Sequence, residues 1–173
     1  MTKTFTFDAL PQERVHFGKS VREVLGDEVE RLGAKRVFVA TSKTLHEQTG
    51  AISLIATSLK TKIAAIYHGI AEHSKLDGVL DAVRAARAAK ADLLVGVGGG
   101  SIIDGLKVVQ LALSENVETK DQLLALANKR HVKPTPIRQI AIPTTLSGAE
   151  VTPAGGATDE AQGRKLGFMN PFL

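Results

Sequence analysis

Three consecutive glycines, Gly98 to Gly100, are followed directly by Ser101 and, three residues later, by Asp104. Glycine lets the backbone turn sharply and approach a ligand without a Cβ atom in the way. The N–H groups and the dipole at the start of a following helix attract an anion. Ser101 adds a hydroxyl donor, and a carboxylate such as Asp104 is electrostatically favourable in a first helical turn. The pattern is typical of a phosphate-binding turn, although a tight strand-to-helix turn without a ligand has the same composition.

Two other phosphate-binding motifs fit this stretch poorly. A P-loop ends in Gly-Lys-Ser or Gly-Lys-Thr, but Gly105 is followed by Leu106 and Lys107. The Rossmann fingerprint belongs in the first strand-to-helix turn, with an acidic residue closing the next strand about twenty residues later. Here the glycines come late in the chain, and the region near Glu118 and Asp121 has a polar helical pattern.

A second stretch rich in hydroxyl groups, 143–152, follows an apolar strand pattern at 138–142. It contains Thr144, Thr145 and Ser147. Serine and threonine also favour ordinary turns, so these hydroxyls alone do not indicate a ligand. Together with the glycine-rich turn, they predict one crevice lined from two strand ends.

The elements that must position these residues alternate between strand and helix patterns. Strands are predicted at 4–7, 14–18, 36–41, 62–67, 91–97 and 138–142, and a hairpin at 156–168. Helices are predicted at 20–32, 50–59, 102–113 and 121–127, and another opens at 74–77 with the form of a capping box. Ser42 and Lys43 begin a polar turn. This alternation predicts an α/β fold, a Rossmann-like parallel sheet with helices on both faces, with ligands at the carboxyl ends of its strands.

Composition narrows the class of protein. The 173 residues are 43% hydrophobic, which is sufficient for one domain with a core, and we expect a single domain over 1–173. No apolar run approaches twenty residues and no N-terminal signal pattern is present, so we expect a cytoplasmic protein without membrane attachment. The absence of cysteine excludes disulfides and thiolate chemistry. The net charge of +4 is spread along the chain, which argues against nucleic-acid binding.

With both stretches in view, the chain resembles the iron-containing (group III) alcohol dehydrogenase family, whose relatives include glycerol dehydrogenase and dehydroquinate synthase. The run 98–104 is similar to the family's Gly-Gly-Gly-Ser-x-x-Asp pyrophosphate motif, and 143–150 is similar to its Pro-Thr-Thr nucleotide loop. Within the family, 14–18 and 146–153 look most like maleylacetate reductases, which reduce maleylacetate to 3-oxoadipate in the breakdown of aromatic compounds. The similarity covers essentially the whole chain.

The resemblance implies a dehydroquinate synthase-like N-terminal domain and a set of cofactor contacts. The pyrophosphate would lie on 98–101, with Asp104 in the same motif, and the nucleotide and its nicotinamide side would contact Thr144, Thr145 and Ser147. Lys165, on the predicted hairpin, would be a further contact, although an exposed strand lysine has the same appearance. Where alcohol-oxidising members often carry an Asp that binds the ribose hydroxyls, this chain has Ser42 beside Lys43. A hydroxyl next to a cation tolerates a 2′-phosphate, so the expected cofactor is NAD or NADP.

The family's divalent metal is implied only for a helical C-terminal domain, which supplies one Asp and usually three His and which this sequence does not reach. The five histidines here form no such set, and His68 and His73, five residues apart across a predicted loop, do not share a helical face. No metal site is therefore predicted in this chain. No residue has a clear role as general acid or electrophile, so none is predicted to be catalytic.

These observations lead to one main hypothesis and one alternative. The main hypothesis is an NAD(P)-binding domain of a maleylacetate reductase-like oxidoreductase, inactive by itself. The alternative is a non-catalytic dinucleotide-binding or regulatory module that assembles with a partner. An apolar face left by a missing domain would favour a homodimer or a partner that carries that domain.

Overall fold

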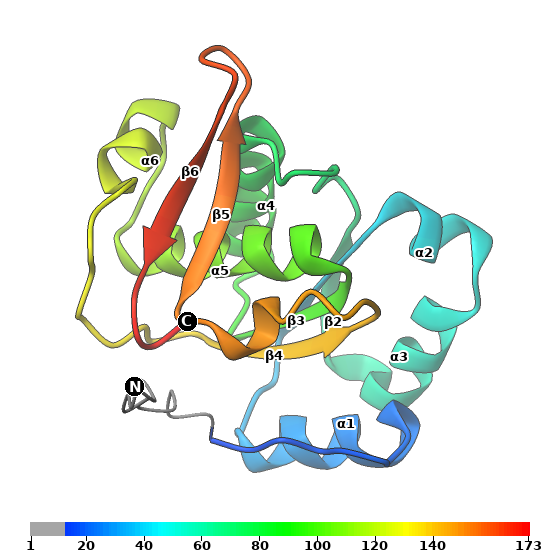
Figure 1. The fold of residues 1–173 in the computed structure, drawn as a ribbon. Helices are drawn as coiled ribbons and strands as arrows, with labels where there is room; N and C mark the ends of the chain where they lie inside the picture. The colour runs from blue at the N-terminus through cyan, green and yellow to red at the C-terminus, as the bar shows by residue number, and fades with distance from the viewer. Residues whose placement is uncertain (1–12) are drawn as a thin grey trace, which may run out of the picture.

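The computed structural model describes residues 13–173, so the strand predicted at 4–7 lies outside the described residues. Its centre is a parallel sheet of four strands in the order β2-β1-β3-β4 (Figure 1). The strands are β1 (Val37–Thr41), β2 (Ile63–Tyr67), β3 (Leu93–Gly98) and β4 (Arg138–Pro143). A separate antiparallel hairpin consists of β5 (Ala154–Asp159) and β6 (Arg164–Met169). The predicted parallel α/β architecture is confirmed.

The carboxyl ends of the central strands lie level with one another. Thr41 of β1 pairs with Val97 of β3, and Gly98 of β3 pairs with Pro143 of β4. After β1 the chain moves outward to β2 and then returns across β1 to form β3 on its other side. The strand order therefore reverses between β1 and β3, which is where ligands bind in open α/β sheets.

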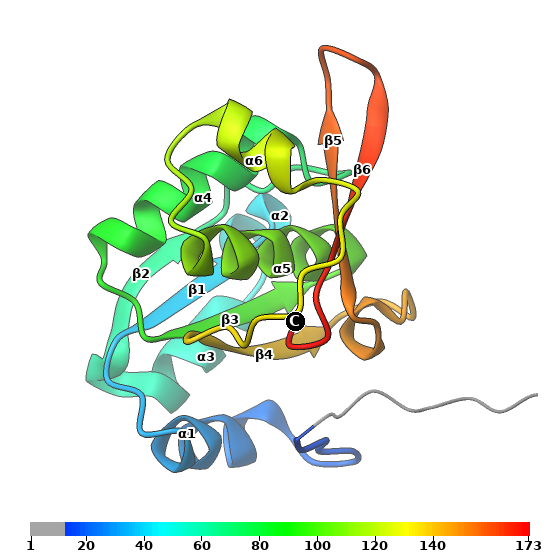
Figure 2. The same ribbon diagram turned by 90° about the vertical axis from the view of Figure 1, so that its left-hand side faces the viewer.

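Helices cover both faces of the sheet (Figure 2). On one face, α1 (Val21–Arg31) and α3 (Ala51–Leu59) pack against alternate strand residues such as Val37 and Val39. On the other face, α4 (Leu76–Ala88) and α5 (Gly100–Ser114) pack against Phe38 and Ala40. Because successive side chains of a strand point to opposite faces, the buried strand β1 contributes side chains to the packing on both faces of the sheet.

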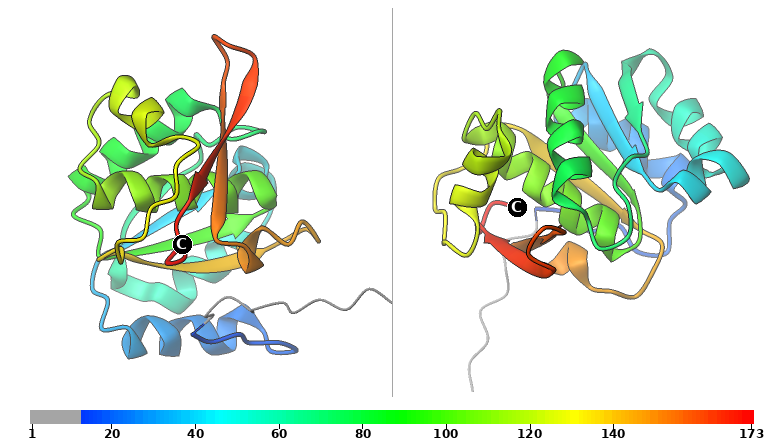
Figure 3. Two further views of the ribbon diagram at one scale, coloured as in Figure 1. Left: turned by 60° about the vertical axis from the view of Figure 1, so that its left-hand side comes forward. Right: turned by 90° about the horizontal axis from the view of Figure 1, so that it is seen from above.

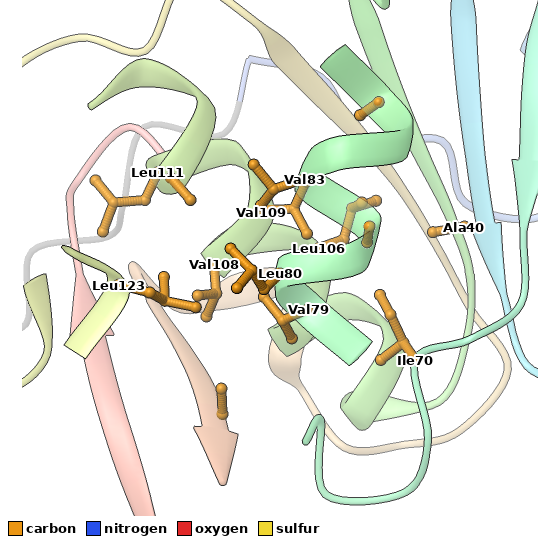
Figure 4. Packing of buried hydrophobic residues seen from close by; sticks show 14 of the residues in the cluster. Ala40, Ile70, Val79, Leu80, Val83, Leu106, Val108, Val109, Leu111 and Leu123 are labelled. Carbon is orange, nitrogen blue, oxygen red and sulfur yellow. The ribbon is translucent and has the colours of Figure 1, made fainter. Parts of the chain in front are cut away.

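The second layer also holds the hairpin. Val79, Leu80 and Val83 of α4 face Leu106 and the neighbouring apolar residues of α5 (Figure 4). The short α6 (Lys120–Leu126) closes this cluster. The hairpin packs against α5, and its turn projects beyond the sheet (Figure 3). The remaining elements are α2 (Lys43–Gln48) and the 3-10 turns η1 (Lys60–Lys62) and η2 (Ala149–Val151).

Four local predictions were wrong. Asp104 lies beyond the first turn of α5, because the helix already begins at Gly100. The strand predicted at 14–18 does not form; instead Arg14 and His16 bond to the Glu28 carboxylate on α1. The polar turn predicted after β1 is the helix α2, which has no buried residue and therefore no apolar pattern to reveal it. The capping box at 74–77 does not form, because Ser74 turns its hydroxyl to the carbonyl of Ser101 rather than to its own helix.

Candidate functional site

The glycine-rich turn joins the end of β3 to the start of α5. Gly99 is the N-cap of α5 and no side chain caps the helix, so its first N–H groups point toward the turn. At Gly98 a Cβ atom would lie 2.7 Å from Cγ1 of Ile102, closer than such atoms can approach. The tight packing of this turn therefore requires glycine, and it leaves the positive end of a helix of 15 residues open to an anion.

Ser101 is held by two bonds from one neighbouring segment. The N–H of His73 donates to Oγ of Ser101 at 3.1 Å, and Oγ of Ser74 donates to the Ser101 carbonyl at 2.6 Å. His73 and Ser74 both have positive φ angles, 61° and 50°, a conformation that non-glycine residues adopt rarely. Because Oγ of Ser101 accepts from the backbone, its own hydrogen is left to be donated to a ligand.

The second hydroxyl-rich stretch packs directly on the glycine-rich turn. The N–H of Thr144 donates to the Gly98 carbonyl at 3.0 Å. A Cβ atom at Gly99 would lie 3.1 Å from Cγ2 of Thr145, and one at Gly100 would lie 2.9 Å from both Cβ and Oγ of Ser147. The structure thus brings the two predicted stretches into contact, glycine against hydroxyl side chain.

An open groove of about 780 Å³ runs beside this contact, between α5, the loop before η2 and the hairpin. Five of the predicted cofactor residues line it: Gly100, Ser101, Asp104, Ser147 and Lys165. Across it, Nζ of Lys165 lies 3.2 Å from Oδ2 of Asp104. The groove offers backbone N–H groups, hydroxyls and one cation, a donor set suited to an anionic ligand.

The other predicted residues do not line the groove. Gly98, Gly99, Thr144 and Thr145 form the turn contact described above. Ser42 follows β1, the strand next to β3, and lies farther along the same sheet edge. Its hydroxyl accepts from the N–H of Leu45 at 3.2 Å and so caps α2. Ser42 is not among the groove-lining residues.

Sequence reasoning missed Lys107 as part of this region. Lys107 lies on α5, is 2% exposed, and donates from Nζ to the carbonyls of Ala149 and Thr152 beneath the groove. Burial lowers the pKa of Lys107 to about 8, although the nearby carboxylates of Asp104 and Glu150 act in the opposite direction. One signal was present in the sequence: Lys107 lies between apolar residues, Leu106 on one side and Val108 and Val109 on the other, where an exposed lysine would not be expected.

The sequence places His68 nearest to His73, but the structure places His68 beside His46. The rings of His46 and His68 stack with centroids 4.5 Å apart, whereas His73 lies by Ser101. Across residues 13–173, no three His, Asp or Glu side chains are grouped so as to hold a metal ion. The described residues therefore do not fit an iron site, and no chemical step is assigned to a metal here. Within the same range, no helix has the length and apolar character needed to cross a membrane.

Fold and site together define a doubly wound α/β domain with a glycine-rich turn at its switch point. The family model for iron-containing alcohol dehydrogenase matches residues 11–173. The chain belongs to the iron-containing alcohol dehydrogenase family, of which it corresponds to the N-terminal part.

Individual relatives agree with this assignment. Dehydrogenase ALT3 of Alternaria alternata is 38% identical over 146 residues, which is 82% of this chain and 38% of that protein. The crystal structure of maleylacetate reductase from Agrobacterium tumefaciens superposes with a TM-score of 0.72 at 29% identity, over 99% of this chain and 41% of that one. Sulfoacetaldehyde reductase from Bifidobacterium kashiwanohense, solved in complex with NAD+, shares the fold with a TM-score of 0.83 at 22% identity, over 98% and 45%. The chain therefore spans about two fifths of the length of these relatives.

Proposed function

We propose that these residues bind the dinucleotide NAD(H) or NADP(H) as the nucleotide-holding part of a dehydrogenase or reductase. The observation that carries the proposal is the contact between the glycine-rich turn and the loop 144–147 at the switch point of the sheet. One crevice at this place presents both a helix N-terminus and hydroxyl donors. A pyrophosphate flanked by two nucleosides needs this combination.

The arrangement suggests where each part of the cofactor would lie. The pyrophosphate would accept from the N–H groups at the start of α5 and from Oγ of Ser101. The nicotinamide half would contact Thr144, Thr145 and Ser147. The ammonium group of Lys165 would donate to the pyrophosphate. The adenosine ribose would lie toward Ser42, where a neighbouring cation, Lys43, tolerates a 2′-phosphate. NAD and NADP are both compatible with this end of the crevice.

The role of these residues in a reaction would be binding and orientation. Bound NADH or NADPH supplies the hydride. The chain would hold its nicotinamide ring at the open groove and shield one face of it, and the substrate would approach the other face. We assign no general acid among the described residues, and we propose that charge developing on a substrate is stabilised by a further part of the complete protein.

We further propose that the complete protein acts as a maleylacetate reductase-like enzyme. The similarity of the loop 146–153 to such enzymes and the match to the reductase of Agrobacterium tumefaciens support this substrate class. A divalent metal and the remainder of the substrate site would come from a further domain, supplied by the same protein or by a partner, and a homodimer is expected. Without that domain, the 173 residues would bind the dinucleotide with little or no turnover.

A non-catalytic dinucleotide-binding module is the alternative, because the glycine-rich turn and the hydroxyl-rich loop are all that dinucleotide binding would need. Turnover separates the two. Oxidation of NADH in the presence of maleylacetate, by the chain mixed with a C-terminal segment from a family member, is expected only for the enzyme-like function. Dinucleotide binding without turnover in that mixture would support the module.

The first experiment is a calorimetric titration of the chain with NADH and with NADPH, repeated on Gly99→Asp. The new carboxylate would point at Thr145 and the phosphate position, so saturable binding is expected for the parent chain and none for this variant. Gly50→Asp is the matched control, because Gly50 caps α3 with no atom near its Cβ position. Absence of binding to the parent chain, or equal binding to both variants, would contradict the proposal.

A further inference from the structure

We propose that Lys107 is a positioning residue for the dinucleotide site: its ammonium group fixes the loop with Thr144, Thr145 and Ser147 against the glycine-rich turn. This inference rests on the proposed function, because it concerns the assembly of the same site. It adds a residue that does not line the groove and that acts through the backbone of the loop.

One buried cation holds three successive points of the chain. Nζ of Lys107 donates to the carbonyl of Ala149 at 2.5 Å, to that of Thr152, and to that of Ala154 at 3.4 Å. These carbonyls lie at the start of η2, just after its end, and at the start of β5. Lys107 therefore holds the junction between the loop and the hairpin against α5, the helix that begins at the glycine-rich turn.

The loop has a second fixed point at its other end. There the N–H of Thr144 donates to the carbonyl of Gly98. Between the two fixed points, Ser147 presses against Gly100 with no room for a Cβ atom.

Removing the ammonium group would leave the hydroxyl of Thr152 as the remaining side-chain donor to the Ala149 and Ala154 carbonyls, and this one hydroxyl cannot satisfy both at once. The loss of hydrogen bonds favours movement of the loop. Movement of Ser147 away from Gly100 would separate the two halves of the site.

A lysine that only stabilises the core would not make dinucleotide affinity depend on its charge. A lysine that positions the loop would, so the effect of its charge on affinity separates a structural role from a positioning role. The carboxylates that face Lys107 are Asp104 on its own helix and Glu150 on η2, and Lys165 of β6 pairs with Asp104. Burial lowers the pKa of Lys107 to about 8, with both carboxylates opposing this. An ammonium group donates three hydrogens and a neutral amine two. Dinucleotide affinity is therefore expected to fall as pH rises through about 8.

The test is titration of NADH, from pH 6.5 to pH 9.5, into the parent chain, Lys107→Met, Lys107→Arg and Lys129→Met. Lys129 is exposed and serves as the matched control. For the parent and the control, affinity should fall by about tenfold across this range. Lys107→Met should bind about tenfold more weakly at pH 6.5 and show no dependence on pH, and Lys107→Arg should recover part of the affinity. Parent affinity and the parent pH profile in Lys107→Met would overturn the inference.

Amide hydrogen exchange tests the same inference without a ligand. Peptides covering 144–152 should exchange faster in Lys107→Met than in the parent chain, while α1 stays unchanged; equal exchange would overturn the inference. If Lys107→Met does not fold, the inference is tested by the pH dependence of NADH affinity in the parent chain and by the affinity of Lys107→Arg. A parent affinity that does not change with pH would overturn the positioning role of Lys107. If the parent chain binds no NADH at any pH, the proposed function fails, and exchange alone decides on Lys107.

Discussion

Nζ of Lys165 on β6 lies 3.2 Å from Oδ2 of Asp104 on α5, so one ion pair spans the groove between the hairpin and the helix. Gly156 makes this approach possible, because a Cβ atom there would lie 2.3 Å from Cε of Lys165. The lysine side chain is 61% exposed, so the pair contributes little to stability. Its effect is to keep a cation over the groove and to offset a carboxylate that would repel a phosphate.

Replacing this lysine should weaken dinucleotide binding without unfolding the chain. Lys165→Met removes the cation and leaves the Asp104 carboxylate uncompensated, so affinity for NADH should fall by about threefold to tenfold. The thermal midpoint should stay within a few degrees of the parent value, because the pair is exposed. Calorimetric titration measures the affinity, and the double variant Asp104→Asn with Lys165→Met should recover part of it. An unchanged affinity in Lys165→Met would show that the ion pair is only a surface contact.

The contact between Gly100 and Ser147 gives a second prediction. Gly100→Ala places a Cβ atom 2.9 Å from Cβ and Oγ of Ser147, so the loop has to move away from the glycine-rich turn. NADH affinity should fall by about tenfold or more. The loss of folding stability caused by the close contact should be smaller, because alanine has a better helix propensity than glycine. Gly50→Ala, at a helix start with open space around it, should bind normally. Equal affinities in the two variants would mean that the contact is unimportant for binding.

Patterns that depend on burial were predictable from the sequence. All four strands of the parallel sheet, α1, α3, α5 and the hairpin were expected close to their observed positions, since apolar periodicity reports which face is buried. The glycine-rich turn and the loop 143–152 were expected at strand ends, and the structure places them in contact. Their assignment as cofactor residues stays a prediction.

Features decided by polar contacts between distant segments were not predictable. The segment 14–17 has the alternation of a strand, but its Arg14 and His16 instead meet a carboxylate on α1. Ser74 has the sequence of a helix cap, but its hydroxyl donates across to Ser101 on another helix. The apolar neighbours of Lys107 indicate burial, but the carbonyls of Ala149 and Thr152 that accept from it belong to a distant segment. In each case the partner is more than ten residues away in sequence.

A third prediction concerns the preference between NADH and NADPH, which we propose is set at the end of β1. Ser42→Asp keeps a side-chain acceptor at the N-cap of α2, so helix stability should be unaffected. The added carboxylate repels a 2′-phosphate but can accept from a ribose 2′-hydroxyl. NADPH affinity should therefore fall by about tenfold, while NADH affinity stays equal or improves. Paired titrations with NADH and NADPH measure the ratio, and a parallel loss of both affinities would place the adenosine ribose elsewhere.

The ion cluster on Glu28 leads to a prediction of acid sensitivity. Burial raises the pKa of the Glu28 carboxyl, but hydrogen bonds from Arg31, His16 and Arg14 outweigh it and lower the pKa from 4.5 to about 2. A carboxyl whose pKa is lower in the folded chain stabilises it above the unfolded value, and this stabilisation is lost as pH falls from about 4.5 toward 2. Because Arg14 is half-exposed, solvent reduces the contribution to about 1–2 kcal/mol.

Urea unfolding of the parent chain and Glu28→Gln, at pH 7 and at pH 3, measures this contribution. The variant should be less stable at pH 7, and the difference should shrink at pH 3, where the parent carboxyl has lost much of this stabilisation. Glu118→Gln, an exposed carboxyl outside the cluster, should match the parent chain at both pH values. A difference that is the same at pH 7 and pH 3 would mean that Glu28 stabilises the chain by packing rather than by its charge, because packing does not titrate.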